Sequence, residues 1–416
     1  MTTPRSKSRK HLLAFFIICF VSVVVLWMTS YNPLDSISKP PFSMMLNSSH
    51  RTHWNILMRN ASISTKNESD AVNYTEPAIA MMTYLRDITL KLPAQIDDFF
   101  LYVTDIFSKP WSHNLNNTML FRLFYSSETN KNFYDEVMLT QKNTGNTSIG
   151  RRKLPKESLL PQPPYKSCSV VGSSGLLLGS KCGRRIDEQD FVFRFNLASI
   201  AGFEEDVGKK TNMTTLNPSI VKRYRLENAS NRAEFSRSKL FDQEGVIWTT
   251  MTNIDRTVDA IKLLNDSNIT LVMGNKKHLN ENAEFWKRYA GLGRRPTTGF
   301  YFVTGALNLC SEVHLFGFWP FTTSLDGRNI PSHYYDDLTL RKIHDASYEL
   351  KLLLNMHQLG LLKFHIENCT TGDIKYVPRQ SWFTKVVNSA HHLFQSIVPG
   401  LNQLLLILDN KDSLEK

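Results

Sequence analysis

From about residue 165 onward, short runs of apolar residues alternate with stretches in which apolar residues recur every three or four positions. Short apolar runs predict buried strands, and the longer spacing predicts helices with one apolar face. The expected strands are residues 169–172, 191–195, 246–250, 269–273, 313–318 and 361–366. The expected helices are residues 233–241, 255–264, 281–289, 298–309 and 346–356. Alternation of strands and helices is typical of a mostly parallel sheet covered by helices.

We therefore predict one α/β domain of the Rossmann type at residues 165–370, with helices on both faces of the sheet. Residues 371–416 form an extension in which apolar residues recur at roughly helical spacing on either side of Pro399 and Gly400. Because proline interrupts a helix, we expect this extension to be partly helical and to dock on the core or on a membrane surface.

The amino terminus predicts a membrane anchor. Residues 1–11 carry four basic side chains and no acidic one, and they precede an uncharged apolar run within residues 12–29. The run ends in Leu26, Trp27 and Met28 instead of the small residues of a cleavage site, so we favour an uncleaved anchor over a signal peptide. Basic residues before the anchor keep the amino terminus cytosolic, which predicts a single-pass type II protein with a luminal catalytic part.

Residues 30–164 are interpreted as a glycosylated stem and linker, although an independent small domain is the alternative. They contain scattered prolines, weak periodicity and one helical stretch at residues 78–107. Glycosylation sequons, which act only in the lumen, occur along the whole chain. They begin at Asn47, Asn60, Asn67, Asn73, Asn116, Asn146, Asn212, Asn228, Asn265, Asn268 and Asn368.

Four cysteines lie beyond the apolar run, at Cys168, Cys182, Cys310 and Cys369. They allow two disulfides in three connectivities, and their wide separation suggests bridges that tie the front of the domain to its back. Such bridges are stable in an oxidising compartment, which agrees with the predicted luminal topology.

Composition narrows the classes of function. Hydrophobic residues at 42% and charged residues at 21% exclude a disordered chain and a multi-pass membrane protein. The formal net charge of +11 would suit nucleic acid, anionic lipid or an acidic small substrate. Nucleic acid is rejected because the predicted topology places the chain in the lumen.

Two turns could hold an anion. Residues 172–175 (Gly-Ser-Ser-Gly) follow the first expected strand, where glycine lets backbone N–H groups approach a phosphate, but many tight turns look similar. Residues 294–299 (Arg-Arg-Pro-Thr-Thr-Gly) open an expected helix, so hydroxyls, N–H groups and the positive end of the helix dipole converge there. An ordinary threonine cap with solvated arginines is the alternative at the second turn.

Two nearby histidines are candidates for proton transfer. His333 lies in a loop beside Asp336, and His344 precedes the helical stretch that contains Glu349. Histidine is a natural base for an alcohol and a natural donor to a departing phosphate, although most single histidines do neither. The chain has no Asp-x-Asp motif of the kind that chelates a divalent ion in sugar transferases, so we expect neither metal nor cofactor.

Four ordered segments resemble the sialyl motifs of the animal sialyltransferases. The large motif is similar to CSVVGSSGLLLGSKCGRRIDEQDFVFRFNLA, which begins at Cys168, followed by DVGKKTNMTTLNPSI. The small motif resembles RRPTTGFYFVTGALNLCSEVHLFGFWPF, the third motif resembles HYYDD, and His344 with Glu349 resembles the very small motif. The NPSI and GFWPF segments resemble the α-2,8-sialyltransferase branch.

The resemblance implies a GT-A-like domain in the Golgi that transfers sialic acid from CMP-sialic acid, with inversion and without metal, to O8 of a terminal sialic acid. His344 would be the base and His333 would contact the donor phosphate. The resemblance also implies disulfides between Cys168 and Cys310 and between Cys182 and Cys369. Residues at the family's donor-binding positions are Ser173, Asn196, Thr297, Thr298, Gly299, Trp319 and Ser332.

Departures from the family pattern leave alternatives open. Ser173 replaces the asparagine of the family's donor-binding turn, and residues 345–348 lack the proline common before the final glutamate. The alternative is therefore a weakened relative that binds sialylated glycans or partners with active transferases. The choice between glycoprotein and ganglioside acceptors, the number of sialic acids added and the oligomeric state, including a homodimer, stay open.

Overall fold

The computed structural model describes residues 74–129, 134–143, 146–153, 165–223, 231, 245–250, 270–336 and 344–377. The expected cytosolic tail and anchor lie outside these residues, as do the expected helices at 233–241 and 255–264 and the extension beyond residue 377. Within the described part of the chain, no helix combines the length and the apolar character needed to cross a bilayer.

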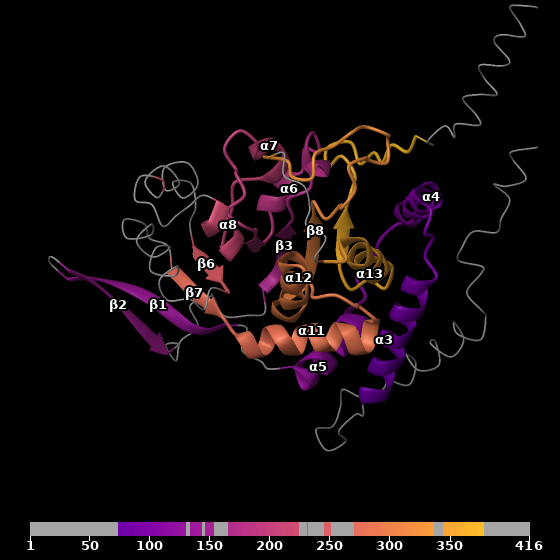
Figure 1. The fold of residues 1–416 in the computed structure, drawn as a ribbon. Helices are drawn as coiled ribbons and strands as arrows, with labels where there is room; N and C mark the ends of the chain where they lie inside the picture. The colour runs from indigo at the N-terminus through magenta and orange to yellow at the C-terminus, as the bar shows by residue number, and fades with distance from the viewer. Residues whose placement is uncertain are drawn as a thin grey trace, which may run out of the picture. The chain divides into compact units, whose positions relative to one another are not determined.

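The fold is α/β, and its centre is a seven-stranded parallel sheet (Figure 1). The strand order across the sheet is β7-β6-β5-β4-β3-β8-β9, and a hairpin of β1 and β2 continues it antiparallel beyond β7. The parallel strands are β3 (Tyr165–Val171), β4 (Phe191–Phe193), β5 (Met213–Thr215), β6 (Val246–Thr249), β7 (Thr270–Gly274), β8 (Cys310–Phe316) and β9 (Lys363–His365). The hairpin strands are β1 (Tyr134–Asn143) and β2 (Asn146–Lys153).

The chain reverses its direction of travel across the sheet at β3. From β3 successive strands are added on one side as far as β7, and β8 then returns to pair with the other side of β3. In open α/β sheets, ligands bind outside the carboxyl ends of the strands at such a switch point. The turns that follow β3 and β8 are therefore the expected place for a binding site.

In the part of the expected domain that the structure describes, three helices are long. They are α11 (Lys276–Ala290), α12 (Thr298–Leu309) and α13 (Ala346–Gln358), and each contains one of the helices expected from the sequence. Helix α12 is buried along most of its length, and it packs on β3 and β8. Shorter helical segments follow individual strands, at Gly175–Leu177 (η2), α6 (Gly183–Asp187), α7 (Glu204–Val207) and α8 (Pro218–Arg223).

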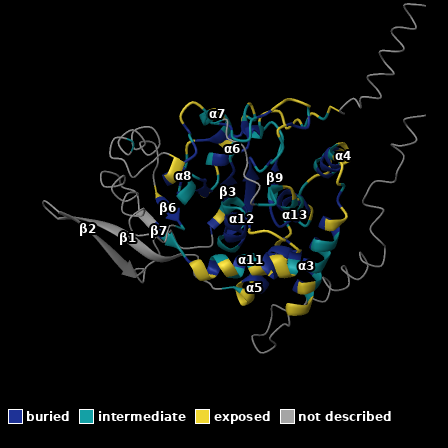
Figure 2. Cartoon of the chain, viewed as in Figure 1, coloured by how far each residue is buried: buried dark blue, intermediate teal, exposed yellow. Residues whose placement is uncertain are grey.

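Three further helices correct the expected boundary at residue 165. Helices α3 (Thr75–Leu90), α4 (Ile96–Phe107) and α5 (Leu115–Glu128) fall within the predicted stem, yet α3 packs on α11 and α13 and α5 packs on α11 and α12. Figure 2 shows that one side of α3 and of α5 is buried while the other is exposed. The hydroxyl of Tyr102 on α4 donates to Asn355 Oδ1 on α13 at 2.9 Å. The apolar positions of these helices find their partners far along the sequence, which is why local pattern alone did not assign them to the core.

Two disulfides cross the domain. One joins Cys168 on β3 to Cys310 on β8, and the other joins Cys182, just before α6, to Cys369, beyond β9. The bridged cysteines are separated by 142 and 187 residues. In the chain-entropy view, cross-links that close loops this long each oppose unfolding by about 5 kcal/mol.

Candidate active site

A cavity of about 580 Å³ opens at the carboxyl ends of the parallel strands. Its walls come from the turns after β3, β4, β5 and β8, the first turn of α12, the loop around residue 333 and the start of α13. Both candidate histidines and all seven candidate donor-binding residues line this cavity. They are His333, His344, Ser173, Asn196, Thr297, Thr298, Gly299, Trp319 and Ser332.

The floor of the cavity is formed where the turns after β3 and β8 cross. The N–H of Gly172 donates to the carbonyl of Phe316 at 2.7 Å, and that of Ser174 donates to the carbonyl of Gly317 at 3.1 Å. A Cβ atom on Gly172 would lie 2.3 Å from the carbonyl oxygen of Gly317, so only glycine permits this approach. The cavity therefore sits at the switch point of the sheet.

The same β3 turn holds the loop that carries His333. The carbonyl of Ser173 accepts from the N–H of Tyr334 at 2.8 Å, and the Tyr334 hydroxyl donates to the carbonyl of Ser199 at 2.7 Å. The backbone carbonyl of Ser173 therefore helps to hold this loop, and this contact does not depend on the side chain at position 173. The N–H of Gly175 also donates to the carbonyl of Pro331 at 3.1 Å, which fixes the other end of the loop.

Thr297 caps the amino terminus of α12. Its hydroxyl accepts from the N–H of Phe300 at 3.1 Å, which satisfies one of the N–H groups in the first turn of the helix. The Thr298 hydroxyl accepts from Nδ2 of Asn217 at 3.0 Å, and the N–H of Asn217 donates to Asn196 Oδ1 at 3.3 Å. Polar groups after β4 and β5 are thereby joined to the start of α12.

Asn196 has a positive φ of 56°, a conformation that asparagine tolerates better than most residues. Asn196 was predicted from the sequence as a site residue, whereas Asn217, which begins the NPSI segment two residues after β5, was not. An asparagine before a proline at the end of a strand was the available signal. It carried little weight because β5 has only three residues and was not among the expected strands.

Glu349 is a buried carboxyl group bound by Thr297. Its Oε1 accepts from the Thr297 N–H at 2.7 Å, and its Oε2 lies 2.6 Å from the Thr297 hydroxyl. Burial raises the pKa of Glu349 from 4.5 to about 7, although the hydrogen bonds from Thr297 oppose this shift. Near neutral pH this carboxyl group is therefore only partly ionised, which lowers the negative charge in the wall of the cavity.

The two histidines have different partners. Nδ1 of His333 lies 2.7 Å from Oδ1 of Asp336, whose Oδ2 lies 3.3 Å from Nη1 of Arg223. Nδ1 of His344 lies 2.8 Å from the carbonyl oxygen of Arg295. Since a carbonyl oxygen only accepts, Nδ1 of His344 carries the proton, and Nε2 of the neutral ring is left as an acceptor. A carboxylate oxygen also accepts, so Nδ1 of His333 donates to Asp336, which fixes the direction of that ring.

The remaining predicted residues complete the walls. Trp319 is buried, and its indole N–H donates to the carbonyl of Thr323 at 2.9 Å, so the ring is held in a fixed position. Ser332 lines the cavity directly before His333. Arg223 and Arg295, which were not among the predicted donor residues, supply the cationic side chains of the lining.

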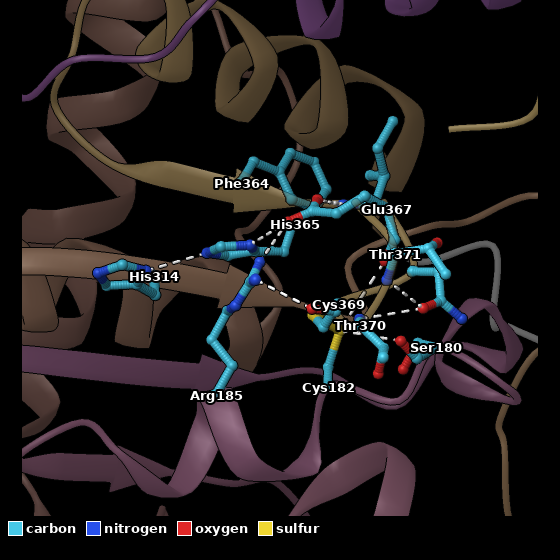
Figure 3. A network of polar contacts seen from close by, with 12 residues as sticks. Ser180, Cys182, Arg185, His314, Phe364, His365, Glu367, Cys369, Thr370 and Thr371 are labelled. Atoms are coloured by element: carbon cyan, nitrogen blue, oxygen red, sulfur yellow. Dashed lines mark hydrogen bonds and ion pairs between the residues drawn. A yellow bond between two sulfur atoms is a disulfide. The ribbon is translucent and has the colours of Figure 1, made fainter. Parts of the chain in front are cut away.

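One group of side chains has the composition of a metal site and lies apart from the cavity lining. His365, Glu367 and Cys369 bring their ligand atoms within 4.8 Å of one another. Figure 3 shows, however, that the Cys369 sulfur is bonded to Cys182 and that His365 points at Glu367, with Nδ1 to Oε1 at 2.7 Å. Arg185 binds the same carboxylate oxygen at 2.8 Å. These groups satisfy one another and join α6 to β9.

The chain matches a family model and several curated proteins. The family model described as glycosyltransferase family 29 (sialyltransferase) matches residues 112–361. Alpha-N-acetylneuraminide alpha-2,8-sialyltransferase of Xenopus laevis is 37% identical over 225 residues, which cover 51% of this chain and 63% of that protein. Alpha-2,8-sialyltransferase 8E of Rattus norvegicus is 35% identical over 226 residues, which cover 52% of this chain and 60% of that protein.

The chain thus spans somewhat less than two thirds of the length of these curated relatives. A solved structure described as a mammalian sialyltransferase is 20% identical, covers 72% of this chain and 96% of its own, and superposes with a TM-score of 0.38. The family model covers more than half of the chain, including both turns that form the floor of the cavity and both histidines. The protein belongs to glycosyltransferase family 29, the sialyltransferases.

Proposed function

We propose that the protein is an inverting α-2,8-sialyltransferase that moves sialic acid from CMP-sialic acid to O8 of a terminal sialic acid on a glycoprotein or glycolipid. The observation that carries this proposal is that one cavity contains two histidines whose Nδ1 atoms have different partners. The partner of His333 is the carboxylate of Asp336, and that of His344 is the carbonyl oxygen of Arg295. His344 has the acceptor nitrogen that a base needs. His333 has a ring direction fixed by the Asp336 carboxylate, as a donor to the phosphate needs. The names of the curated relatives support the α-2,8 linkage.

In the proposed reaction, Nε2 of His344 takes the proton from the acceptor hydroxyl as O8 attacks C2 of the donor sugar. The new bond joins O8 to C2, the bond between C2 and the phosphate oxygen breaks, and CMP leaves with that electron pair. His333 donates a hydrogen bond from Nε2 to the phosphate, where negative charge develops. The N–H groups at the start of α12 add the positive end of the helix dipole.

Metal independence is part of the proposal. Charge on the departing phosphate would be met by His333, Arg223 and the first turn of α12. The donor-binding set is proposed to be Ser173, Asn196, Thr297, Thr298, Gly299, Trp319 and Ser332, within a GT-A-like domain of the Rossmann type. We also propose that residues 12–29 anchor the protein in the Golgi membrane with the cavity in the lumen, which the two disulfides support.

Ser173 favours a second candidate, a weakened relative that binds sialylated glycans. Its side chain is shorter than the asparagine of the family pattern and lacks the amide's donor and acceptor pair. One assay separates the candidates: release of CMP by the full-length protein with sialylated and unsialylated acceptors. Activity that needs a sialylated acceptor and is lost in His344→Ala supports the transferase, whereas no turnover with any acceptor supports the second candidate.

A further inference from the structure

The described lining of the cavity contains few charged groups. They are the arginines Arg223 and Arg295 and the carboxyl group of Glu349, together with the two histidines. Because burial raises the pKa of Glu349 to about 7, its carboxyl group is only partly ionised near neutral pH and repels an anion less than an ordinary carboxylate would. The arginines give the lining its positive charge, although Arg223 is paired with Asp336.

The two arginines are divided between the two histidines. Arg223 contacts Asp336, which in turn contacts His333. Its guanidinium is therefore connected to the histidine that is proposed to contact the donor phosphate. Arg295 is connected to the proposed base instead, because its own carbonyl oxygen accepts from Nδ1 of His344 at 2.8 Å. The Arg295 side chain is exposed, and it has no ion-pair or hydrogen-bond partner among the residues that the structure describes.

The proposed reaction places an anion near His344. If His344 is the base, the attacking O8 must come within hydrogen-bond reach of its Nε2, about 2.6–3.2 Å. The sugar that carries O8 is itself a sialic acid, so its carboxylate is part of the same sugar. A guanidinium fits a carboxylate with two parallel hydrogen bonds, which fixes both the position and the orientation of the sugar.

We infer that Arg295 binds the carboxylate of the acceptor's terminal sialic acid and so selects an anionic acceptor over a neutral one. This inference rests on the proposed function and adds a specificity-determining residue to it. Arg295 acts from the base side of the cavity, where its backbone orients His344 while its side chain holds the sugar that His344 deprotonates. Arg223 and His333 are assigned to the donor phosphate instead.

The test compares two acceptors with the full-length protein: a sialylated oligosaccharide, and the same compound with its terminal carboxylate converted to a carboxamide. The wild type is expected to prefer the carboxylate by roughly tenfold or more in kcat/KM, as the loss of one charged hydrogen-bonded pair implies. Arg295→Gln should raise KM for the carboxylate acceptor by a similar factor. It should leave KM for CMP-sialic acid within about twofold and make the two acceptors nearly equal.

Two further variants make the result specific. Arg295→Lys keeps the charge without the paired donors and should recover part of the preference. Arg288→Gln removes an exposed arginine of α11 outside the cavity and should keep the wild-type preference. Because the preference is a ratio between two acceptors, it is unaffected by a general loss of activity that follows from a displaced His344.

The outcomes separate the inference from the proposed function. Wild-type turnover with an unchanged preference in Arg295→Gln would overturn the inference and leave the proposed function intact. A rise in KM for CMP-sialic acid without a change in acceptor preference would also overturn it, since Arg295 would then bind the donor. A wild-type protein that transfers sialic acid to no sialylated acceptor would overturn both.

Discussion

Thr297 binds both oxygens of Glu349, one through its backbone N–H at 2.7 Å and the other through its hydroxyl at 2.6 Å. The same hydroxyl caps α12 by accepting from Phe300. One residue therefore connects the start of α12 to α13 at the cavity wall. The connection holds whether or not the carboxyl is ionised, because the threonine hydroxyl can donate to a carboxylate or accept from a carboxylic acid.

The raised pKa of Glu349 predicts a pH-dependent stability. Between about pH 4.5 and pH 7 the folded state keeps a proton that the unfolded chain has released, so this carboxyl group makes the protein less stable as pH rises through that window. Glu349→Gln keeps the shape and both hydrogen bonds but does not titrate. Its free energy of unfolding should exceed that of the wild type by about 1–3 kcal/mol at pH 8 and approach or fall below it at pH 5.

Urea unfolding at several pH values measures this difference. Glu188→Gln is the matched control, because Glu188 is exposed and its carboxylate lies 3.6 Å from Nε of the exposed Arg184. A Glu349→Gln variant whose stability parallels the wild type across the whole pH range would contradict a raised pKa in the folded state.

Asp336→Asn should weaken the role proposed for His333. An amide oxygen can still accept from Nδ1 and hold the ring, but it has no negative charge to offset positive charge on a ring that donates to the phosphate, so CMP should depart more slowly. We expect kcat to fall by roughly 10- to 100-fold while KM for CMP-sialic acid changes little. Steady-state kinetics checks this, with Asp105→Asn on α4 as a control that removes a surface carboxylate. Equal losses in both variants would argue against it.

Gly172→Ala should disrupt the floor of the cavity. The added methyl group would overlap the carbonyl oxygen of Gly317 at 2.3 Å, and neither backbone can move without separating β3 from β8. We expect a loss of at least about 2 kcal/mol in stability together with loss of activity. Gly293→Ala is the matched control, since no atom lies within 4 Å of its Cβ position. A thermal unfolding temperature unchanged in Gly172→Ala would refute the close approach.

The sequons should differ in their use. Asn116 is exposed on α5, whereas Asn212 accepts from the N–H of Val192 at 2.9 Å and Asn368 donates to the carbonyl of Gly179 at 3.0 Å. A glycan on Asn368 would replace one hydrogen of the nitrogen that contacts Gly179 and would have to fit beside that turn, and a glycan on Asn212 would crowd the neighbouring strand. Mass spectrometry of the protein from secretory cells should find glycan at Asn116 and little at Asn212 or Asn368. Full occupancy at Asn212 would contradict the packing around β4.

Much of the site could be read from the sequence because its residues lie in the turns that follow short apolar runs. Six of the seven parallel strands contain or overlap an expected one, and the cavity lining includes Gly172 after β3, Gly317 after β8 and the two threonines at the start of α12. Such turns are specified locally by glycine and by capping hydroxyls, which makes them visible without knowledge of the packing.

The rest depended on contacts between distant residues. Strand β5 was missed because three residues are too few to show a period, and its place is set by pairing with β4 and β6. Helix α4 was assigned to a stem because its partner Asn355 is 253 residues away from Tyr102. Arg223 was overlooked as a cavity residue, and Arg295 was placed in a possible anion-binding turn without being assigned to the donor-binding set, because a charged residue near a turn is usually solvated and only the fold shows which ones line a common cavity.

The two cystines enclose overlapping stretches of sequence, since the segment from residue 183 to residue 309 lies inside both. A protease that cuts the backbone once in that segment leaves two fragments joined by two covalent ties. The nicked enzyme would migrate as a single band on a gel without thiol and as two bands after reduction. A single cut between residues 183 and 309 therefore cannot by itself release either half of the cavity. A cut before Cys168, in contrast, leaves its amino-terminal fragment held by noncovalent packing alone.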